Sequence, residues 1–302
     1  MSPAPEQVTA TRPASDMQRE SEDAWAALKK SANHYGIYTV GFFSLFVLWH
    51  IVSVYLFSSV LFPPPLPVLA KAGELMANGK LFEHVGYSMM RIAVGFTLGS
   101  AIGIVIGLLM GSFASVRRFL DPYVETLRFI PAVAMITVAV IWFGIGETSK
   151  FFIITYATVF IVILTTAAGV SSIAPNKVRA AQSLGATRTQ IFFLVTLPAT
   201  VPFILTGMRV AMANAFTTIV AAELVAANHG IGTLPWQSRL YMLIPEIFVA
   251  LLTLALLGFT VDRCFRWAIY KFAGRYSPVR AAAQIVCGDC YVGLSLRRTK
   301  HA

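Results

Sequence analysis

The stretch RAAQSLGATRTQIFFLVTLP, residues 179–198, decides how this chain folds, because it opens with polar residues between two long apolar runs. It also carries residues that begin and end helices. Pro175 suits a first helical turn, where its missing N–H loses no hydrogen bond. Gly185 can adopt the left-handed conformation that ends a helix, and Thr187 with Gln190 forms a T-x-x-Q capping box that begins the next one. The sequence therefore predicts two short helices joined by a glycine turn, outside the bilayer.

Pro198 is predicted to end the second short helix, just before the next apolar run. A plain solvated loop between two spans would seldom carry so complete a set of helix signals. A DNA-binding helix-turn-helix is excluded, because membrane spans on both sides would keep the helices out of a groove. The pair is therefore interpreted as a structured element on one face of a membrane protein.

The composition fits only a membrane protein. The 302 residues are 57% hydrophobic and 13% charged, with a mean hydropathy of +0.70, values that soluble domains do not reach. Three cysteines provide neither a disulfide framework nor a zinc set. Cys287 and Cys290 form a lone C-x-x-C, and tetrahedral zinc would need two more ligands. No metal site is predicted.

Three regions follow from the distribution of apolar residues. Residues 1–35 are rich in Ala, Ser, Pro, Glu and Gln and are predicted to form a mostly disordered cytoplasmic tail. Residues 36–270 hold six predicted transmembrane helices, and residues 271–302 form a polar cytoplasmic tail. The first apolar run, Ile37 to Leu61, starts too late and is too long for a cleavable signal peptide, so it is predicted to be a signal-anchor helix.

The other five spans are predicted at about 85–110, 121–143, 151–172, 201–224 and 247–269, which leaves a loop at about 173–198. Asp121 and Pro122 resemble an N-cap and first-turn pair that opens the third span. The loop GIGETSK, residues 144–150, lacks the G-K-[S/T] order of a phosphate-binding loop, and no Walker A motif occurs in the chain. Any ATP used would therefore be hydrolysed by another chain.

Lysine and arginine placement predicts the orientation. Of the 24 such residues, 18 lie in the two ends of the chain, with the C-terminal end counted from Arg263 in the last turns of the sixth span, and in the loops 111–128 and 173–200; only four lie in the other three loops. Under the positive-inside rule both termini and the short helix pair are cytoplasmic. The net charge of +10 therefore reflects topology, and no nucleic-acid partner is predicted.

Glycines recur every four residues along the second span, and such a stripe lets another helix backbone approach closely. Because four residues overshoot one turn by about 40°, the groove winds and a partner helix is expected to cross obliquely. Packing within the protein is favoured over a substrate role. The glycines are Gly95, Gly99, Gly103, Gly107 and Gly111.

Arg209 lies within the fifth span, where a charged residue is a functional candidate. Met212, Phe216 and Glu223 follow it on one helical face at steps of three and four. Arg209 and Glu223 are about 21 Å apart along the helix, too far to pair with each other. This face is a candidate lining for a translocation pathway. The alternative is that Arg209 snorkels or caps carbonyls and Glu223 ends the span; Arg91 is interpreted as structural or snorkelling.

Residues 179–198 resemble the cytoplasmic "EAA" loop of binding-protein-dependent ABC importer permeases, whose pattern is E-A-A-x3-G-x9-I-x-L-P. Two positions depart from that pattern: Arg179 replaces a glutamate and Val195 replaces an isoleucine. The positions that match are Ala180, Ala181, Gly185, Leu197 and Pro198.

Three further stretches are similar to the nitrate, sulfonate, taurine and bicarbonate branch of these permeases. They are RIAVGFTLGSAIGIVIGLLMG (91–111), PAVAMITVAVIWFGIGETSKFFII (131–154) and AAELVAANHGIGTL (221–234). The resemblance implies an all-α integral membrane protein with the type I ABC importer permease fold and a cytoplasmic coupling helix. It also implies a transport subunit, not an enzyme, that moves a small organic or inorganic anion across the inner membrane.

The partners that the resemblance implies are two ABC ATPase subunits carrying ATP and magnesium, an extracytoplasmic solute-binding protein and a second permease copy in a homodimer. No cofactor is expected in this chain. The matching loop residues, together with Arg179, would couple the permease to the ATPase. At Arg179 the partner surface would be acidic or neutral, or the side chain faces water. The alternative functions are an ion-coupled secondary transporter, a membrane enzyme and an assembly scaffold.

Overall fold

The computed structural model describes residues 40–41, 43–56 and 61–273, which form helices and no strand. The predicted tail 1–35 and the predicted polar tail from residue 274 on, with Cys287 and Cys290, lie outside the described residues. The described residues divide into two units, one with residues 40–41 and 43–56 and the other with residues 61–273. Each is treated by itself.

The first unit contains the apolar helix Phe43–Leu56, whose last five residues form a π-helical segment, η1 (Val52–Leu56). This helix is the described part of the predicted signal anchor.

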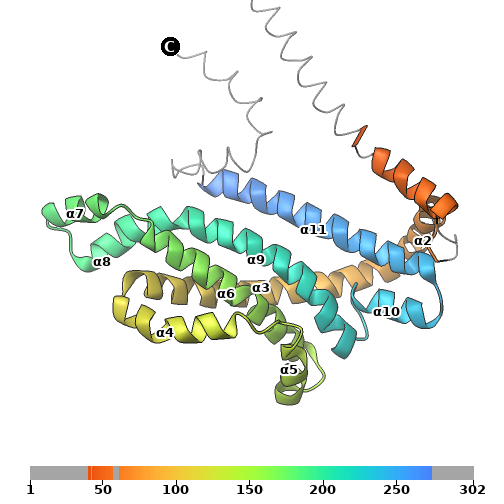
Figure 1. The fold of residues 1–302 in the computed structure, drawn as a ribbon, viewed down its shortest axis with the longest axis horizontal. Helices are drawn as coiled ribbons and strands as arrows, with labels where there is room; N and C mark the ends of the chain where they lie inside the picture. The colour runs from red at the N-terminus through yellow and green to blue at the C-terminus, as the bar shows by residue number, and fades with distance from the viewer. Residues whose placement is uncertain (1–39, 42, 57–60, 274–302) are drawn as a thin grey trace, which may run out of the picture. The chain divides into compact units, whose positions relative to one another are not determined.

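The second unit holds the remaining helices (Figure 1). They are α2 (Pro65–Ala77), α3 (Lys80–Ser112), α4 (Ala114–Leu127), α5 (Met135–Phe143), α6 (Glu147–Ser171), α7 (Pro175–Ser183), α8 (Arg188–Ile191), η2 (Phe192–Thr196), α9 (Leu197–Ala226), α10 (Thr233–Leu240) and α11 (Ile244–Ala273).

Four helices among the described residues are long and apolar enough to cross a membrane: Lys80–Ser112, Glu147–Ser171, Arg188–Leu224 and Ile244–Ile269. They correspond to the second, fourth, fifth and sixth predicted spans. Two helices were not predicted. α2 lies between the first and second predicted spans, and α10 lies in the loop between the fifth and sixth spans.

The third predicted span, 121–143, is not one continuous helix. It is built from α4 and α5, which are separated by turns around Pro131. Asp121 and Pro122 do not open a helix as predicted, because α4 already begins at Ala114 and includes both residues. Asp121 instead forms an i,i+4 ion pair with Arg117 at 3.5 Å. Pro122 lies inside α4, where its ring removes one backbone hydrogen-bond donor from the helix.

The glycine stripe of α3 lies against α6. A Cβ atom added to any of the five glycines would lie 2.5–2.8 Å from the Cβ atom of a facing α6 residue, so only glycine fits at this separation. The facing residues are also spaced by four, and all are β-branched: Ile154, Thr158, Val162, Thr166 and Val170. The contact therefore continues along five successive steps of both helices.

The glycine contact also fixes the direction of the two helices. Gly95 meets Ile154 and Gly111 meets Val170, so residue numbers increase together and α3 and α6 are parallel. Parallel neighbours require the chain to travel back between them. The α4–α5 segment makes this return: Val124 packs beside Met110 near the end of α3, and Ala139 packs beside Ile153 near the start of α6.

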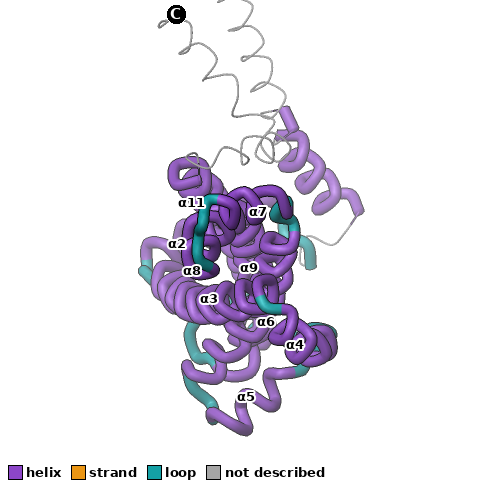
Figure 2. The backbone as a smooth tube through the Cα atoms, turned by 90° about the vertical axis from the view of Figure 1, so that its left-hand side faces the viewer, coloured by secondary structure: helices purple, strands orange, loops and turns teal. Residues whose placement is uncertain are grey.

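Helix α9 packs antiparallel to α6. Gly169 meets Phe203 and Gly207 meets Thr165, so residue numbers increase in opposite directions. A buried cluster then joins α3, α6 and α9 through Ile92, Ile154, Ala215, Phe216 and Ile219. Helix α11 packs against one side of these three helices (Figure 2). Only 11% of its most apolar stretch is buried inside the protein.

Pro198 does not end the second short helix as predicted. Helical structure continues from Arg188 through Leu224, and the π-helical segment η2 (Phe192–Thr196) lies just before the proline. A π turn widens the helix, and this provides room for a ring that would otherwise clash with the preceding turn. The fifth span and the second short helix are therefore one element.

Candidate functional site

The helix pair α7–α8 has the local structure that its sequence predicts. Pro175 is in the first turn of α7. Gly185 has a φ of +77°, and the N–H of Ala186 donates to the carbonyl of Ala181 at 3.1 Å, as in a Schellman motif. Thr187 and Gln190 form the reciprocal capping box that begins α8.

No residue of α7 is buried. Arg179 and Ala180 are exposed and Ala181 is half-buried, whereas Leu184, at the end of the helix, is 88% exposed. Leu197 and Pro198 are half-buried in the first turn of α9. The pair projects at one end of the bundle, at the left of Figure 1. An exposed helix with small side chains and an exposed leucine can bind the surface of a partner protein.

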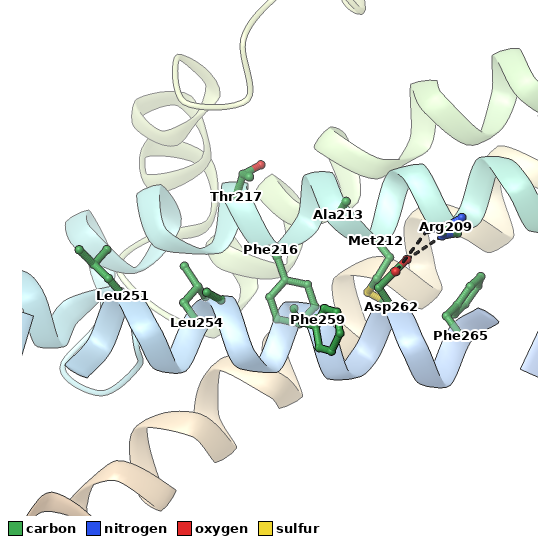
Figure 3. Close-up of a pocket in the computed structure, with 12 residues that line it drawn as sticks. Arg209, Met212, Ala213, Phe216, Thr217, Leu251, Leu254, Phe259, Asp262 and Phe265 are labelled. Atoms are coloured by element: carbon green, nitrogen blue, oxygen red, sulfur yellow. Dashed lines mark hydrogen bonds and ion pairs between the residues drawn. The ribbon is translucent and has the colours of Figure 1, made fainter. Parts of the chain in front are cut away.

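A pocket of about 370 Å³ lies between α9 and α11. Most of its lining is apolar, and Arg209 with Asp262 supplies the charge at one end (Figure 3). Of the four residues predicted to line a pathway, Arg209, Met212 and Phe216 line this pocket. A cavity of this size, apolar with a few polar groups, can hold a small solute.

Asp262 forms ion pairs with two arginines. Arg209 Nε donates to Asp262 Oδ1 at 2.6 Å, and its Nη2 lies 3.3 Å from Oδ2. Arg266 Nη2 lies 2.8 Å from the same carboxylate. Two guanidinium groups against one carboxylate leave one net positive charge beside the pocket, which favours an anionic occupant.

Glu223 does not line this pocket, and its place in a translocation pathway stays a prediction. Its side chain is fully buried and forms an ion pair with Arg91 at 2.7 Å. The ion pair explains how α9 carries a carboxylate near its end without exposing it to lipid or water. Arg91 is itself 2% exposed and is structural, as interpreted from the sequence.

Four charged side chains meet at this point, and we call them the Arg91 cluster: Arg91, Glu147, Lys150 and Glu223. Arg91 Nε and Nη2 donate to the two oxygens of Glu147 at 2.6 and 2.8 Å. Lys150 Nζ donates to Glu147 at 2.9 Å. Two cations and two anions cancel, so the cluster is neutral as a whole.

The Arg91 cluster fixes the loop 227–232, which follows α9. Arg91 Nη1 donates to the carbonyl of His229 at 2.5 Å. The N–H of Gly232 donates to Glu223 Oε2 at 2.7 Å, and that of Ile231 donates to Ser88 Oγ at 2.8 Å. A Cβ on Gly230 would overlap the carboxyl group of Glu223. The glycines of the HGIG sequence are therefore required by close backbone approach.

Two neighbouring contacts reinforce this end of the bundle. His84 Nδ1 lies 2.9 Å from the nitrogen and 2.8 Å from the oxygen of Gly230. Lys71 of α2 pairs with Glu246 of α11 at 3.2 Å. The hydrogen bonds that the Lys71 amine donates to Glu74 and to Glu246 raise its pKa above the usual value.

Sequence reasoning missed the Arg91 cluster because its members are far apart in the chain. Arg91 and Glu223 were recognised separately as charges in or near spans, and Lys150 was counted as an ordinary loop cation. The sequence signal for this ion pair was two charges of opposite sign in predicted spans, Arg91 and Glu223, with HGIG a few residues after the glutamate. Within the described ranges no group of three or more His, Cys, Asp or Glu could hold a metal ion.

The parallel α3–α6 contact, the exposed α7–α8 pair and the apolar spans define a polytopic membrane permease. The chain belongs to the family of binding-protein-dependent transport system inner membrane components, whose model matches residues 75–276. The Arg91 cluster, the α7–α8 pair and the α9–α11 pocket all lie inside the matched region.

Relatives with known names place the chain in the nitrate, sulfonate and taurine type of ABC importer permease. A probable ABC transporter permease protein of Brucella melitensis is 40% identical over 210 residues, 70% of this chain and 85% of that protein. The taurine transport system permease protein TauC of Escherichia coli is 36% identical over 223 residues, 72% of this chain and 81% of that protein. The nitrate import permease protein NrtB of Synechocystis is 31% identical, over 72% of this chain and 82% of that protein.

Solved structures agree on the fold. The MetNI methionine ABC transporter in an inward-facing conformation matches with a TM-score of 0.53 at 19% identity, covering 64% of this chain and 97% of that one. A bacterial alginate ABC transporter, in complex with a pentasaccharide-bound periplasmic protein, matches with a TM-score of 0.53 at 15% identity, covering 87% and 98%. The described part of the chain therefore has the type I ABC importer permease fold.

Proposed function

We propose that this chain is the membrane subunit of an importer that moves a small organic or inorganic anion into the cytoplasm, driven by ATP hydrolysis on separate ATPase subunits. The observation that carries the proposal is the exposed α7–α8 pair. It stands in sequence directly between α6 and α9, so a partner that moves the pair also moves two spans. The chain has no Walker A motif, so ATP and magnesium would bind the partner.

The proposed orientation places the α7–α8 pair and both termini in the cytoplasm, on the evidence of lysine and arginine placement. The Arg91 cluster and α10 would then lie on the opposite, extracytoplasmic side, where a solute-binding protein would deliver the substrate. A second copy of the chain would complete the pathway. In this arrangement residues 1–35 and 271–302 would be cytoplasmic tails on either side of the transmembrane region 36–270.

Coupling in this proposal uses Arg179, Ala180, Ala181 and Gly185 of the α7–α8 pair. The two alanines let a partner surface come close to the α7 backbone, and Gly185 sets the direction of α8. Leu197 and Pro198, in the first turn of α9, would pass the movement into the fifth span. The glycines of α3 would keep α6 and α3 together while this happens.

An anionic substrate is supported by two observations. The pocket between α9 and α11 has one net positive charge from Arg209, Asp262 and Arg266. Relatives include taurine, aliphatic sulfonate and nitrate permeases. We propose that Arg209, Met212 and Phe216 face the route of the anion, and that Arg209 is a transient partner for its charge.

The test is reconstitution. The chain is co-expressed with candidate ABC ATPase and solute-binding protein subunits from the same genome, and the purified complex is placed in proteoliposomes. Uptake of radiolabelled taurine, an alkyl sulfonate and nitrate is then measured with ATP, without ATP, and with an imposed proton or sodium gradient. ATP-dependent uptake that requires the binding protein is expected. Uptake driven by an ion gradient without ATP would instead identify an ion-coupled secondary transporter.

A further inference from the structure

Glu147 and Lys150 of the Arg91 cluster lie in the first turn of α6, whereas the α7–α8 pair follows the last turn of that helix, so the two features are at opposite ends of α6. The Arg91 cluster joins three helices that are distant in the sequence. Arg91 comes from α3, Glu147 and Lys150 come from the first turn of α6, and Glu223 comes from the last turns of α9. Groups of α3 and α9 hold the loop 227–232 directly, and α6 is joined to it through Arg91.

The polar groups of this cluster are mutually satisfied. Arg91 uses Nε, Nη1 and Nη2 as donors. The two oxygens of Glu223 accept from Arg91, from Ser88 Oγ and from the N–H of Gly232. Separating such a pair within the protein would leave a charge buried without a partner, which is strongly unfavourable. The geometry is that of a permanent clamp.

We infer that the loop 227–232 stays fixed to α3, α6 and α9 throughout the transport cycle, and that Arg91 is the positioning residue that holds it there. This inference rests on the proposed function. A displacement at the α7–α8 pair enters α6 and α9 directly, because the pair connects them. The glycine contact joins α3 to α6, and the Arg91 cluster joins α3, α6 and α9 at the start of α6. The loop 227–232 therefore moves together with these three helices and does not open as a gate.

The first experiment locks the loop to α3. Glu83, in the first turn of α3, and His229, in the loop, form a contact at 3.1 Å, and both side chains are about half exposed. The variant carries Glu83→Cys and His229→Cys in a chain whose Cys264, Cys287 and Cys290 are replaced by serine. A short bis-thiosulfonate reagent links the two cysteines in the complete complex, and dithiothreitol removes the link.

The linked transporter is expected to take up the solute at a rate within about twofold of its rate before linking. If residues 83 and 229 stay together throughout the transport cycle, a covalent link between them does not restrict it. A loss of uptake on linking that dithiothreitol restores would overturn the inference, since it would show that the loop must leave α3. The two single-cysteine variants, treated in the same way, control for modification of each position.

The second experiment tests Arg91 itself. Arg91→Met removes the donors to Glu147 and Glu223 while keeping a long apolar side chain. If Arg91 positions the loop, uptake and the stimulation of ATP hydrolysis by the solute-binding protein are expected to fall about tenfold, within the usual range of coupling between distant sites. Basal ATP hydrolysis, which belongs to the partner subunits, is expected to persist.

Arg263→Gln, an exposed change on α11, is the matched control for loss of one arginine. Normal stimulation and uptake in Arg91→Met would overturn the assignment of Arg91. If Arg91→Met does not assemble, the linking experiment still decides the inference, because its cysteines replace only exposed side chains. Absence of ATP-dependent uptake in the wild type would instead refute the proposed function, which keeps the two failures distinguishable.

Discussion

Arg209 of α9 donates to Asp262 of α11 at 2.6 Å, and this pair closes one end of the pocket between the two helices (Figure 3). The side chains of Arg209 and Asp262 are 27% and 33% exposed. Charged groups with that exposure, inside two candidate spans, are unfavourable against lipid. This face is therefore expected to be covered by protein or to meet water in the assembled transporter.

Arg209→Gln is expected to reduce uptake without preventing assembly. Asp262 keeps its partner Arg266 at 2.8 Å, so no carboxylate is left unpaired. The variant loses one hydrogen bond between the Arg209 guanidinium and the anion, which is worth about 1.5–3 kcal/mol. This loss corresponds to at least about a tenfold fall in the uptake rate. Initial uptake rates in proteoliposomes measure the effect, with Arg263→Gln as the control. Equal rates in Arg209→Gln and wild type would remove Arg209 from the pathway.

Gly185→Val is expected to uncouple ATP hydrolysis from transport while membrane insertion remains normal. A Cβ at this position would meet no atom within 4 Å, so the effect comes only from the left-handed backbone. That conformation costs an ordinary residue about 1–2 kcal/mol, and β-branched residues tolerate it least. Gly185→Asn is the control, because asparagine adopts this conformation more readily. The measurement is solute transported per ATP hydrolysed; a normal ratio in the valine variant would contradict the role given to the turn.

Gly103→Ala is expected to destabilise the protein, because its Cβ would lie 2.8 Å from that of Val162 and 2.9 Å from the carbonyl oxygen of Val159. Overpacking of a tight contact typically costs about 1–3 kcal/mol. Gly86→Ala, on the same helix, is the matched control, since a Cβ there meets nothing within 4 Å. Thermal unfolding of the two detergent-solubilised variants should separate them. Identical midpoints would show that α3 can move away from α6 at no cost.

Arg179→Glu distinguishes the two readings of this position. The side chain is exposed in the isolated chain, and an exposed ion pair contributes only ~0–1 kcal/mol. If the ATPase buries Arg179 against an acidic surface, the variant complex should dissociate more readily, most clearly at low salt. Co-purification of the ATPase across a salt series measures this. Retention equal to that of wild type at every salt concentration would show that residue 179 faces water.

The features that the sequence predicted well depend on neighbouring residues. Pro175, Gly185 and the Thr187–Gln190 capping box act within one turn of the chain, so their pattern is sufficient to predict them. The glycine stripe predicted a close helix contact for the same reason, since the spacing of four is a property of one helix. It did not identify the partner, because Ile154 and its neighbours on α6 look like any apolar span.

What the sequence did not predict depends on contacts or on neighbouring backbone that sequence periodicity does not contain. The ion pair of Glu223 was missed because its partner Arg91 lies 132 residues away in the chain. Pro198 and Pro122 were interpreted as helix boundaries from local preference. In the structure Pro198 follows a π turn, and Pro122 lies inside an amphipathic helix whose Val124 packs against the bundle.

The π-helical segment η2 has a mechanical consequence. Because the backbone does not break at Pro198, Arg188–Leu224 is one helix of 37 residues, about 55 Å long. By simple geometry, tilting such a rod about its α8 end sweeps the far end sideways by about 1 Å per degree. A broken helix would absorb that angle at the break. The lever arm therefore depends on the turn at 192–196, and a tilt of a few degrees about α8 is enough to shift Glu223 and the loop beyond it by several ångströms.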